Sequence, residues 1–148
     1  MATRYRLLCI GRRAQDPLLA AADDYLARLH RYADVEVSRL KESGLEDERR
    51  AIESRLAPGA HLVILDEHGE ALSTMDLARR LKRWQELDRD VTLVIGGADG
   101  IHPELKGRAN ETIALSRLTL PHRLAQVLLL EQLYRAHTIL RHEPYHRG

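Results

Sequence analysis

Apolar runs alternate along the chain with segments in which apolar residues recur every three or four positions. One run without charge, Val91–Ile95, is followed at once by Gly96 and Gly97. A continuous apolar run of this length, ended by glycine, is typical of a strand buried on both faces of a parallel sheet. Four further strands are predicted, at residues 5–10, 35–40, 61–66 and 112–118, the third of them ended by a polar turn at residues 67–70.

Helical patterns separate these strands. Asp16 and Pro17 suit the start of a helix, because Asp caps free backbone N–H groups and Pro fits the first helical position. Ser73 and Asp76 match a capping box at the head of a second helix, whose apolar face carries Leu77, Leu81, Trp84 and Leu87. The first of these helices is predicted over residues 18–29, and further helices are predicted near residues 45–56 (in part a loop), after His102-Pro103-Glu104 (a short one) and at 124–141. This alternation predicts one α/β domain over residues 1–148, a layered sandwich with a mostly parallel sheet.

The last predicted helix, residues 124–141, has more apolar positions than one narrow stripe can hold. A surface helix normally buries a single face and exposes the other to water. We therefore expect this helix to be covered on more than one side.

Charge and composition narrow the class of protein. Lys and Arg number 23 against 22 Asp and Glu, so no overall field marks the chain as a general nucleic-acid binder. From residue 101 onward, however, seven Lys or Arg face four Glu, and five of the eight histidines lie there, so this third is where a polyanion would bind. Aromatic residues are only 4% of the chain, which argues against base stacking as the main binding mode.

A single cysteine, Cys9, rules out an intrachain disulfide and favours the reducing cytoplasm. The apolar runs are too short to span a membrane, so we expect no membrane partner. His142 and His146 have the spacing of a helical metal pair, but Pro144 between them prevents a shared helical face. We therefore expect no metal site.

Three segments are expected to meet at the carboxyl edge of the sheet: residues 65–66, 96–100 and 116–121. They offer glycine, backbone groups and aliphatic walls rather than charges. No Walker-type motif is present, and no G-x-G-x-x-G follows the first strand, so phosphate or dinucleotide binding is disfavoured. No G-x-S-x-G element supports a serine hydrolase either. A ligand such as an adenosine without phosphates fits better.

Four motifs, in their order and spacing, resemble the RlmH (YbeA-like) family of small SPOUT-class RNA methyltransferases. They read Leu-Val-Ile-Gly-Gly-Ala-Asp-Gly at 93–100, Leu-Ser-Arg-Leu-Thr-Leu-Pro-His at 115–122, Glu-Gln-Leu-Tyr-Arg-Ala at 131–136 and Pro-Tyr-His-Arg at 144–147. The resemblance extends over the whole chain, although its specific motifs lie from Leu62 onward.

This resemblance implies a SPOUT-type fold whose C-terminal part is threaded as a trefoil knot, against the general rule that knots are absent. It also implies a homodimer that uses S-adenosylmethionine to methylate N3 of a pseudouridine in bacterial large-subunit (23S) rRNA, on the assembled ribosome. Large-subunit rRNA is then the nucleic-acid partner, and DNA is not.

The matched positions imply particular site residues. The tail of one subunit is expected to complete the active site of the other, where Arg147 would favour the imide anion of the substrate and either Tyr145 or His122 would take its proton. His122, Tyr145 and Arg147 are thus the catalytic candidates. The cofactor-binding candidates are Leu65, Gly97, Ser116, Arg117, Leu118, Thr119, Leu120 and Pro121.

The chain departs from the family at Gln126, where relatives usually carry Arg, and this places one RNA or dimer contact in question. Two other functions stay open. One is a SPOUT methyltransferase that acts on tRNA, and the other is a nonenzymatic ribosome-binding module that has kept the fold. The tRNA methyltransferase would differ in its RNA substrate, and the ribosome-binding module would not bind S-adenosylmethionine.

Overall fold

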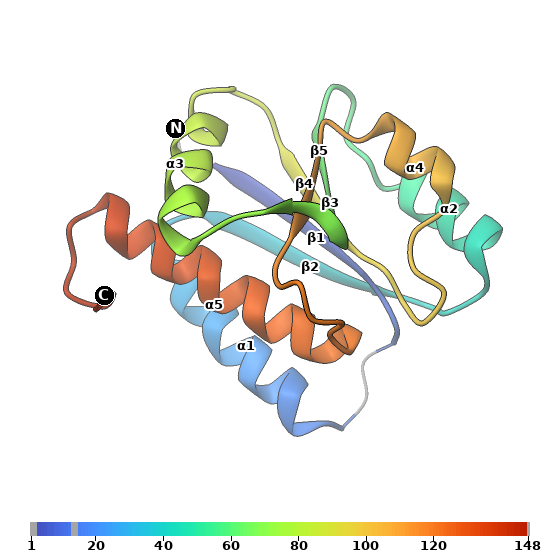
Figure 1. The fold of residues 1–148 in the computed structure, drawn as a ribbon, viewed down its shortest axis with the longest axis horizontal. Helices are drawn as coiled ribbons and strands as arrows, with labels where there is room; N and C mark the ends of the chain where they lie inside the picture. The colour runs from blue at the N-terminus through green and yellow to red at the C-terminus, as the bar shows by residue number, and fades with distance from the viewer. Residues whose placement is uncertain (1–2, 13–14, 148) are drawn as a thin grey trace.

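The computed structural model describes residues 3–12 and 15–147, and within them one sheet carries helices on both faces (Figure 1). The strands are β1 (Arg4–Ile10), β2 (Asp34–Leu40), β3 (His61–Ala71), β4 (Val91–Ile95) and β5 (Glu111–Ala114). The helices are α1 (Pro17–Leu29), α2 (Leu45–Glu53), α3 (Thr74–Gln85), α4 (Pro103–Arg108) and α5 (His122–Leu140).

The strand order is β2-β1-β4-β3-β5, and each pair of neighbouring strands is parallel. Val91 at the start of β4 pairs with Tyr5 on one side and His61 on the other, so the carboxyl ends of the three central strands lie at one edge. The prediction of an α/β sandwich with a mostly parallel sheet is confirmed. The trefoil knot stays a prediction.

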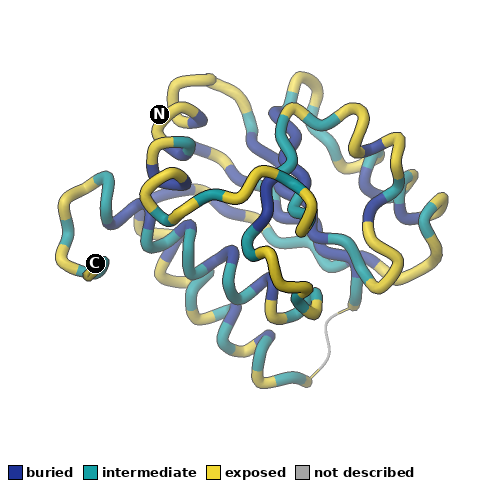
Figure 2. The backbone as a smooth tube through the Cα atoms, in the orientation of Figure 1, coloured by how far each residue is buried: buried dark blue, intermediate teal, exposed yellow. Residues whose placement is uncertain are grey.

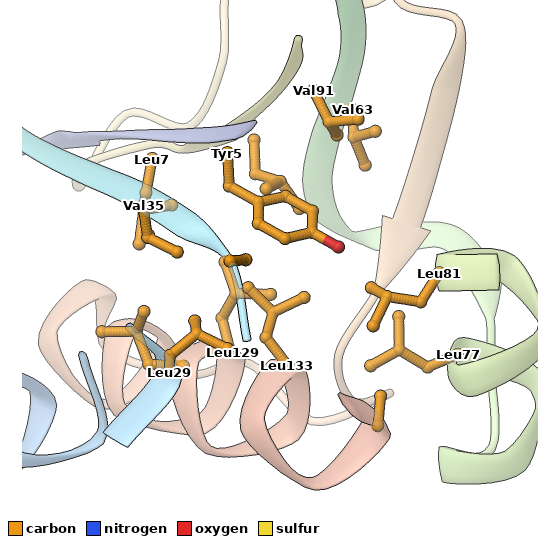
Figure 3. Close-up of a cluster of buried hydrophobic side chains, with 14 of the residues drawn as sticks. Tyr5, Leu7, Leu29, Val35, Val63, Leu77, Leu81, Val91, Leu129 and Leu133 are labelled. Carbon is orange, nitrogen blue, oxygen red and sulfur yellow. The ribbon is translucent and has the colours of Figure 1, made fainter. Parts of the chain in front are cut away.

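The two faces of the sheet are covered by different helices. Helices α1, α3 and α5 pack on one face, around a core that includes Tyr5, Leu7 and Leu133 (Figure 3). On the other face, Leu8 and Ile10 of β1 belong to a second, smaller core. Because successive strand residues point to opposite faces, the unbroken apolar run of β1 serves both cores.

Local sequence signals set the helix starts. The Asp16 carboxylate accepts a hydrogen bond from the Leu18 N–H at 2.7 Å, as the Asp-Pro pair predicts. The Ser73 hydroxyl accepts from the Asp76 N–H at 3.1 Å while the Asp76 carboxylate accepts from the Ser73 N–H at 3.2 Å. The predicted capping box is therefore confirmed.

Two strand boundaries were wrongly predicted. The third strand does not stop at the polar residues 67–70 but resumes after a bulge, where Glu70 pairs with Ile113 and Ala71 with Ala114. Backbone pairing to β5 needs no apolar side chain, and Gly69 allows close approach because a Cβ there would lie 2.6 Å from the Thr112 carbonyl oxygen. The fifth strand ends at Ala114 rather than at residue 118.

Helix α5 lies along the sheet between α1 and α3, which gives it cover on several sides within one chain (Figure 1). Leu124, near its start, is 37% exposed all the same. Leu87, predicted to lie on the apolar face of α3, falls beyond the end of that helix and is also 37% exposed. In the described part of the chain, no helix has the length and apolar character needed to cross a membrane.

Helix α5 also carries a histidine into the main core. His137 is 2% exposed, its Nε2 lies 3.4 Å from the Tyr5 hydroxyl, and its ring stacks on that of Tyr32 at 5.7 Å between centroids. Burial, together with the nearby Arg141 guanidinium, lowers the pKa of His137 to about 4. His137 is therefore a neutral core residue at ordinary pH.

Candidate active site

A cavity of about 590 Å³ opens at the carboxyl edge of the sheet, where the middle of β3 and the end of β4 meet the loop between β5 and α5. The structure thus brings together the three segments expected to converge there. Seven of the eight cofactor candidates line this cavity: Leu65, Gly97, Ser116, Leu118, Thr119, Leu120 and Pro121. Of the described candidates, Arg117 alone does not, and its side chain is exposed.

The glycine turn after β4 forms one wall of the cavity, and its backbone is too tight for larger residues. The Gly100 N–H donates to the Gly97 carbonyl at 3.1 Å, and Gly100 has φ +78°, a left-handed conformation that favours glycine. A Cβ on Gly96 would lie 2.6 Å from the Gly100 carbonyl oxygen. This tight turn exposes backbone groups to the cavity with no side chain in the way.

The side chain that position 97 can carry is limited by Ile10 and Glu42, which lie under the turn, and not by the cavity. A Cβ there would lie 2.9 Å from Ile10 Cγ2 and 3.2 Å from Glu42 Oε1, so a valine would press on β1 and displace the turn, not simply project methyls at a ligand. Glu42 also accepts a hydrogen bond from the Ala98 N–H at 3.3 Å. The end of β2 therefore supports the turn from below.

The loop between β5 and α5 forms the opposite wall, and Figure 2 shows much of it exposed. The Ser116 hydroxyl accepts from the Leu118 N–H at 2.9 Å, which tightens the loop. Leu118 is 75% exposed. The Thr119 hydroxyl donates to the Glu67 carboxylate, so this loop is tied to the bulged part of β3.

His122, the first residue of α5, lines the same cavity and is half-buried. Its ring packs on Gly11, which follows β1 with φ +124°, and a Cβ on Gly11 would lie 2.8 Å from His122 Nε2. Glycine at position 11 thus leaves room for the imidazole in the cavity wall.

The cavity contains one neutralised carboxylate. Asp66 Oδ2 lies 2.5 Å from Lys106 Nζ, and its Oδ1 accepts from the His68 N–H at 2.9 Å. Burial acts to raise the pKa of Asp66, but these hydrogen bonds and the Lys106 charge outweigh it, and the pKa is lowered. Asp66 is therefore a paired anion held to α4.

The lining suits the nucleoside part of S-adenosylmethionine. Ile95, Ile101, Leu115 and Ala125 add apolar surface, and the turn after β4 and the loop before α5 supply backbone N–H and C=O groups. Pockets for small ligands typically combine apolar walls with a few placed polar groups in such a volume. No group of three or more His, Cys, Asp or Glu placed to hold a metal occurs among the described residues.

The other two catalytic candidates, Tyr145 and Arg147, do not line this cavity within one chain. The Tyr145 hydroxyl donates to Glu131 Oε2 at 2.9 Å, and the Arg135 guanidinium lies 4.7 Å from the centre of the Tyr145 ring. Glu131 comes nine residues after His122 on α5, which corresponds to about 14 Å along the helix axis. Figure 1 places the tail beyond the opposite end of α5 from the cavity.

Burial, and then the hydrogen bond to the Glu131 carboxylate, raise the pKa of Tyr145. Arg147 is exposed. One chain therefore does not bring Tyr145 and Arg147 together with His122, so a shared site needs a second copy of the chain.

Sequence reasoning did not identify several residues that shape the site. Gly11 and Glu42, which follow β1 and β2, and Lys106 of α4 support it, and only Gly11, directly after a predicted strand, carried a sequence signal. Gln126 is 1% exposed, and its Oε1 accepts from Arg39 Nε at 3.1 Å. Within one chain, this residue joins α5 to β2 rather than facing RNA.

Comparisons with known proteins place the chain among methyltransferases. Residues 3–146 match the family described as "Predicted SPOUT methyltransferase". A protein of Anaeromyxobacter dehalogenans named "Ribosomal RNA large subunit methyltransferase H" is 42% identical over 97% of this chain and 99% of its own length. The protein of that name from Nitrosomonas eutropha is 41% identical over 98% of this chain and 99% of its own.

A solved structure supports the fold alone. The SpoU methyltransferase AviRb from Streptomyces viridochromogenes aligns with 97% of this chain at a TM-score of 0.52 and 15% identity. The chain spans 62% of that structure's length.

Proposed function

The chain belongs to the SPOUT methyltransferase family, and we propose that it transfers a methyl group from S-adenosylmethionine to large-subunit ribosomal RNA. One observation carries this proposal: relatives named for that activity are 41–42% identical to the chain over nearly the full length of both. The cavity at the carboxyl edge of the sheet, with its apolar walls and glycine turn, is the site to which we assign the cofactor.

We further propose that the acceptor is N3 of a pseudouridine in 23S rRNA, methylated on the assembled ribosome in the cytoplasm. The nearly balanced charge supports a preformed ribosomal surface as substrate, because free RNA is bound mainly through many phosphate contacts. No separate RNA-binding domain is needed for such a target.

The bound cofactor supplies an activated methyl group on a sulfonium, so the protein has to orient the base and manage its proton. We assign acceptance of the N3 proton to His122, which lines the cavity. Tyr145 is less suited to the task, since its hydroxyl donates to Glu131 and its pKa is raised. Arg147 then stabilises the imide anion that develops as the proton leaves.

This assignment requires a homodimer in which the tail of one subunit reaches the cavity of the other. The separation of His122 from Tyr145 within one chain supports it. We assign two exposed apolar residues to the partner: Leu118, which lines the cavity, and the partly exposed Leu124, two residues after His122. The loop between β5 and α5 is where we expect the trefoil knot.

The proposal is tested by methyl transfer to ribosomes that lack the modification, with the position identified by mass spectrometry. Gly97→Val damages the cavity and Arg147→Ala removes the charge from the tail, so we expect each variant alone to be inactive. Co-expressed chains should recover part of the activity, because one of the two sites in a mixed dimer has both an intact cavity and an intact tail.

Three outcomes would contradict parts of the proposal. Mixed dimers as inactive as their parents would exclude the shared site. Modification of tRNA instead of rRNA would replace the substrate. A wild-type protein that binds ribosomes but not S-adenosylmethionine would be a nonenzymatic binding module.

A further inference from the structure

The ionisable residues that line the cavity are Asp66, Glu67 and His122, and they are not equivalent in charge. Asp66 is paired with Lys106 at 2.5 Å. Among the residues that the structure describes, none forms an ion pair with Glu67, whose contact is the hydrogen bond from the neutral Thr119 hydroxyl. Glu67 is thus the carboxylate in the lining whose negative charge has no cation beside it.

Glu67 lies where two walls of the cavity meet. Glu67 lies within β3, beyond Leu65, the last β3 residue paired with β4, and in the bulge before Glu70. Its hydrogen bond to Thr119 joins the β3 wall of the cavity to the loop between β5 and α5. The hydrogen bond therefore holds the carboxylate between these two walls.

Methyl transfer changes the charge of the ligand in this cavity. The S–CH₃ bond breaks, the N3–CH₃ bond forms, the N3 proton leaves, and the sulfonium becomes the neutral thioether of S-adenosylhomocysteine. Donor and product share their adenosine, amino and carboxylate groups, so a charge in the cavity wall is a means of telling them apart. A carboxylate attracts the sulfonium and not the thioether.

We propose that Glu67 is a specificity-determining residue that favours the cationic donor over the neutral product. This inference rests on the proposed function, because it takes S-adenosylmethionine as the ligand. Glu67 is exposed, and water and salt weaken such interactions, so the expected preference is modest: about two- to fivefold in the ratio of dissociation constants. The effect assists product release without adding any contact to the acceptor base.

Isothermal titration of the full-length protein tests this with three probes: S-adenosylmethionine, S-adenosylhomocysteine, and sinefungin, which carries an ammonium in place of the sulfonium. Glu67→Gln keeps a side chain able to accept the Thr119 hydrogen bond and removes only the charge. We expect it to weaken both cationic probes about two- to fivefold and to leave the affinity for S-adenosylhomocysteine unchanged. Glu67→Lys should shift the ratio further in the same direction, and 1 M salt should reduce both effects.

Glu86→Gln is the matched control, since Glu86 has an exposed carboxylate and lies at the C-terminal end of α3, before the amino end of β4. It should leave all three affinities unchanged. Equal losses for the three probes in Glu67→Gln, no loss at all, or a loss that persists in 1 M salt would overturn the role of the charge. Failure of the wild-type protein to bind any probe would instead overturn the proposed function.

Discussion

Gly96→Ala tests whether the turn after β4 builds the cavity. The added methyl carbon would lie 2.6 Å from the Gly100 carbonyl oxygen and 2.9 Å from Ile101 Cδ1. The first contact is with backbone, so no side-chain rotation can relieve it. The turn has to open instead.

The size of the effect follows from these distances. Moving the carbonyl oxygen from 2.6 Å to 3.0 Å, the shortest separation that real Cβ atoms show, requires a displacement of 0.4 Å. The same displacement of the Gly100 N–H from the Gly97 carbonyl would lengthen their 3.1 Å hydrogen bond to 3.5 Å, where it is nearly lost. Overpacking costs about 1–3 kcal/mol and the lost hydrogen bond about 0.5–1.5 kcal/mol, so we expect a loss of about 1.5–4.5 kcal/mol in unfolding free energy.

Urea unfolding measures this loss, and calorimetry with S-adenosylmethionine measures the accompanying loss of affinity. Gly107→Ala in α4 is the matched control, because a Cβ there meets nothing within 4 Å and alanine favours a helix by up to about 1 kcal/mol. If Gly96→Ala unfolded at the wild-type urea concentration and bound the cofactor normally, the turn would not be the rigid wall described above.

Other predictions concern the core, the tail and the dimer. The pKa of His137 is lower in the folded chain (about 4) than in the unfolded one (about 6.5), so stability present above pH 6.5 is lost as the pH falls toward 4. Urea unfolding should therefore show about 1 kcal/mol less stability at pH 5.5 than at pH 7.5 from this group, and His137→Gln should remove that part of the slope. Truncation after Glu143 should leave cofactor binding intact in calorimetry and slow methyl transfer about 10²–10⁴-fold, whereas normal turnover would make the tail dispensable. Leu128 is half-buried and Leu133 is buried, so Leu128→Glu should disturb only a dimer, whereas Leu133→Glu should disturb the core of each chain. A wild-type protein that sediments as a monomer at micromolar concentration would refute the dimer.

Sequence reasoning was most accurate where a local physical signal exists. The capping residues Asp16 and Ser73 begin their helices as predicted, because a cap depends only on neighbouring residues. Apolar runs and apolar–polar alternation located all five strands, and the glycines after β4 indicated the cavity edge.

Sequence reasoning failed where residues distant in the chain determine the local structure. Leu118 made the fifth strand look longer than it is, yet this residue is 75% exposed in the loop after Ala114. Polar residues near Glu70 resembled a turn, but pairing with β5 extends the strand through them. The contact of Gln126 with Arg39 joins residues 87 positions apart, and no local pattern encodes such a pair.

The strand order has a consequence for how the chain can fold during synthesis. β4 lies between β1 and β3, although it follows both in the chain. Tyr5 of β1 therefore cannot form its pair with Val91 until β4 has been synthesised. Until β4 emerges, β3 has no neighbour and β1 exposes one edge, and open edges of this kind invite aggregation. The sheet therefore closes late and through long-range contacts, which predicts slow folding in which the N-terminal half gains little stability by itself.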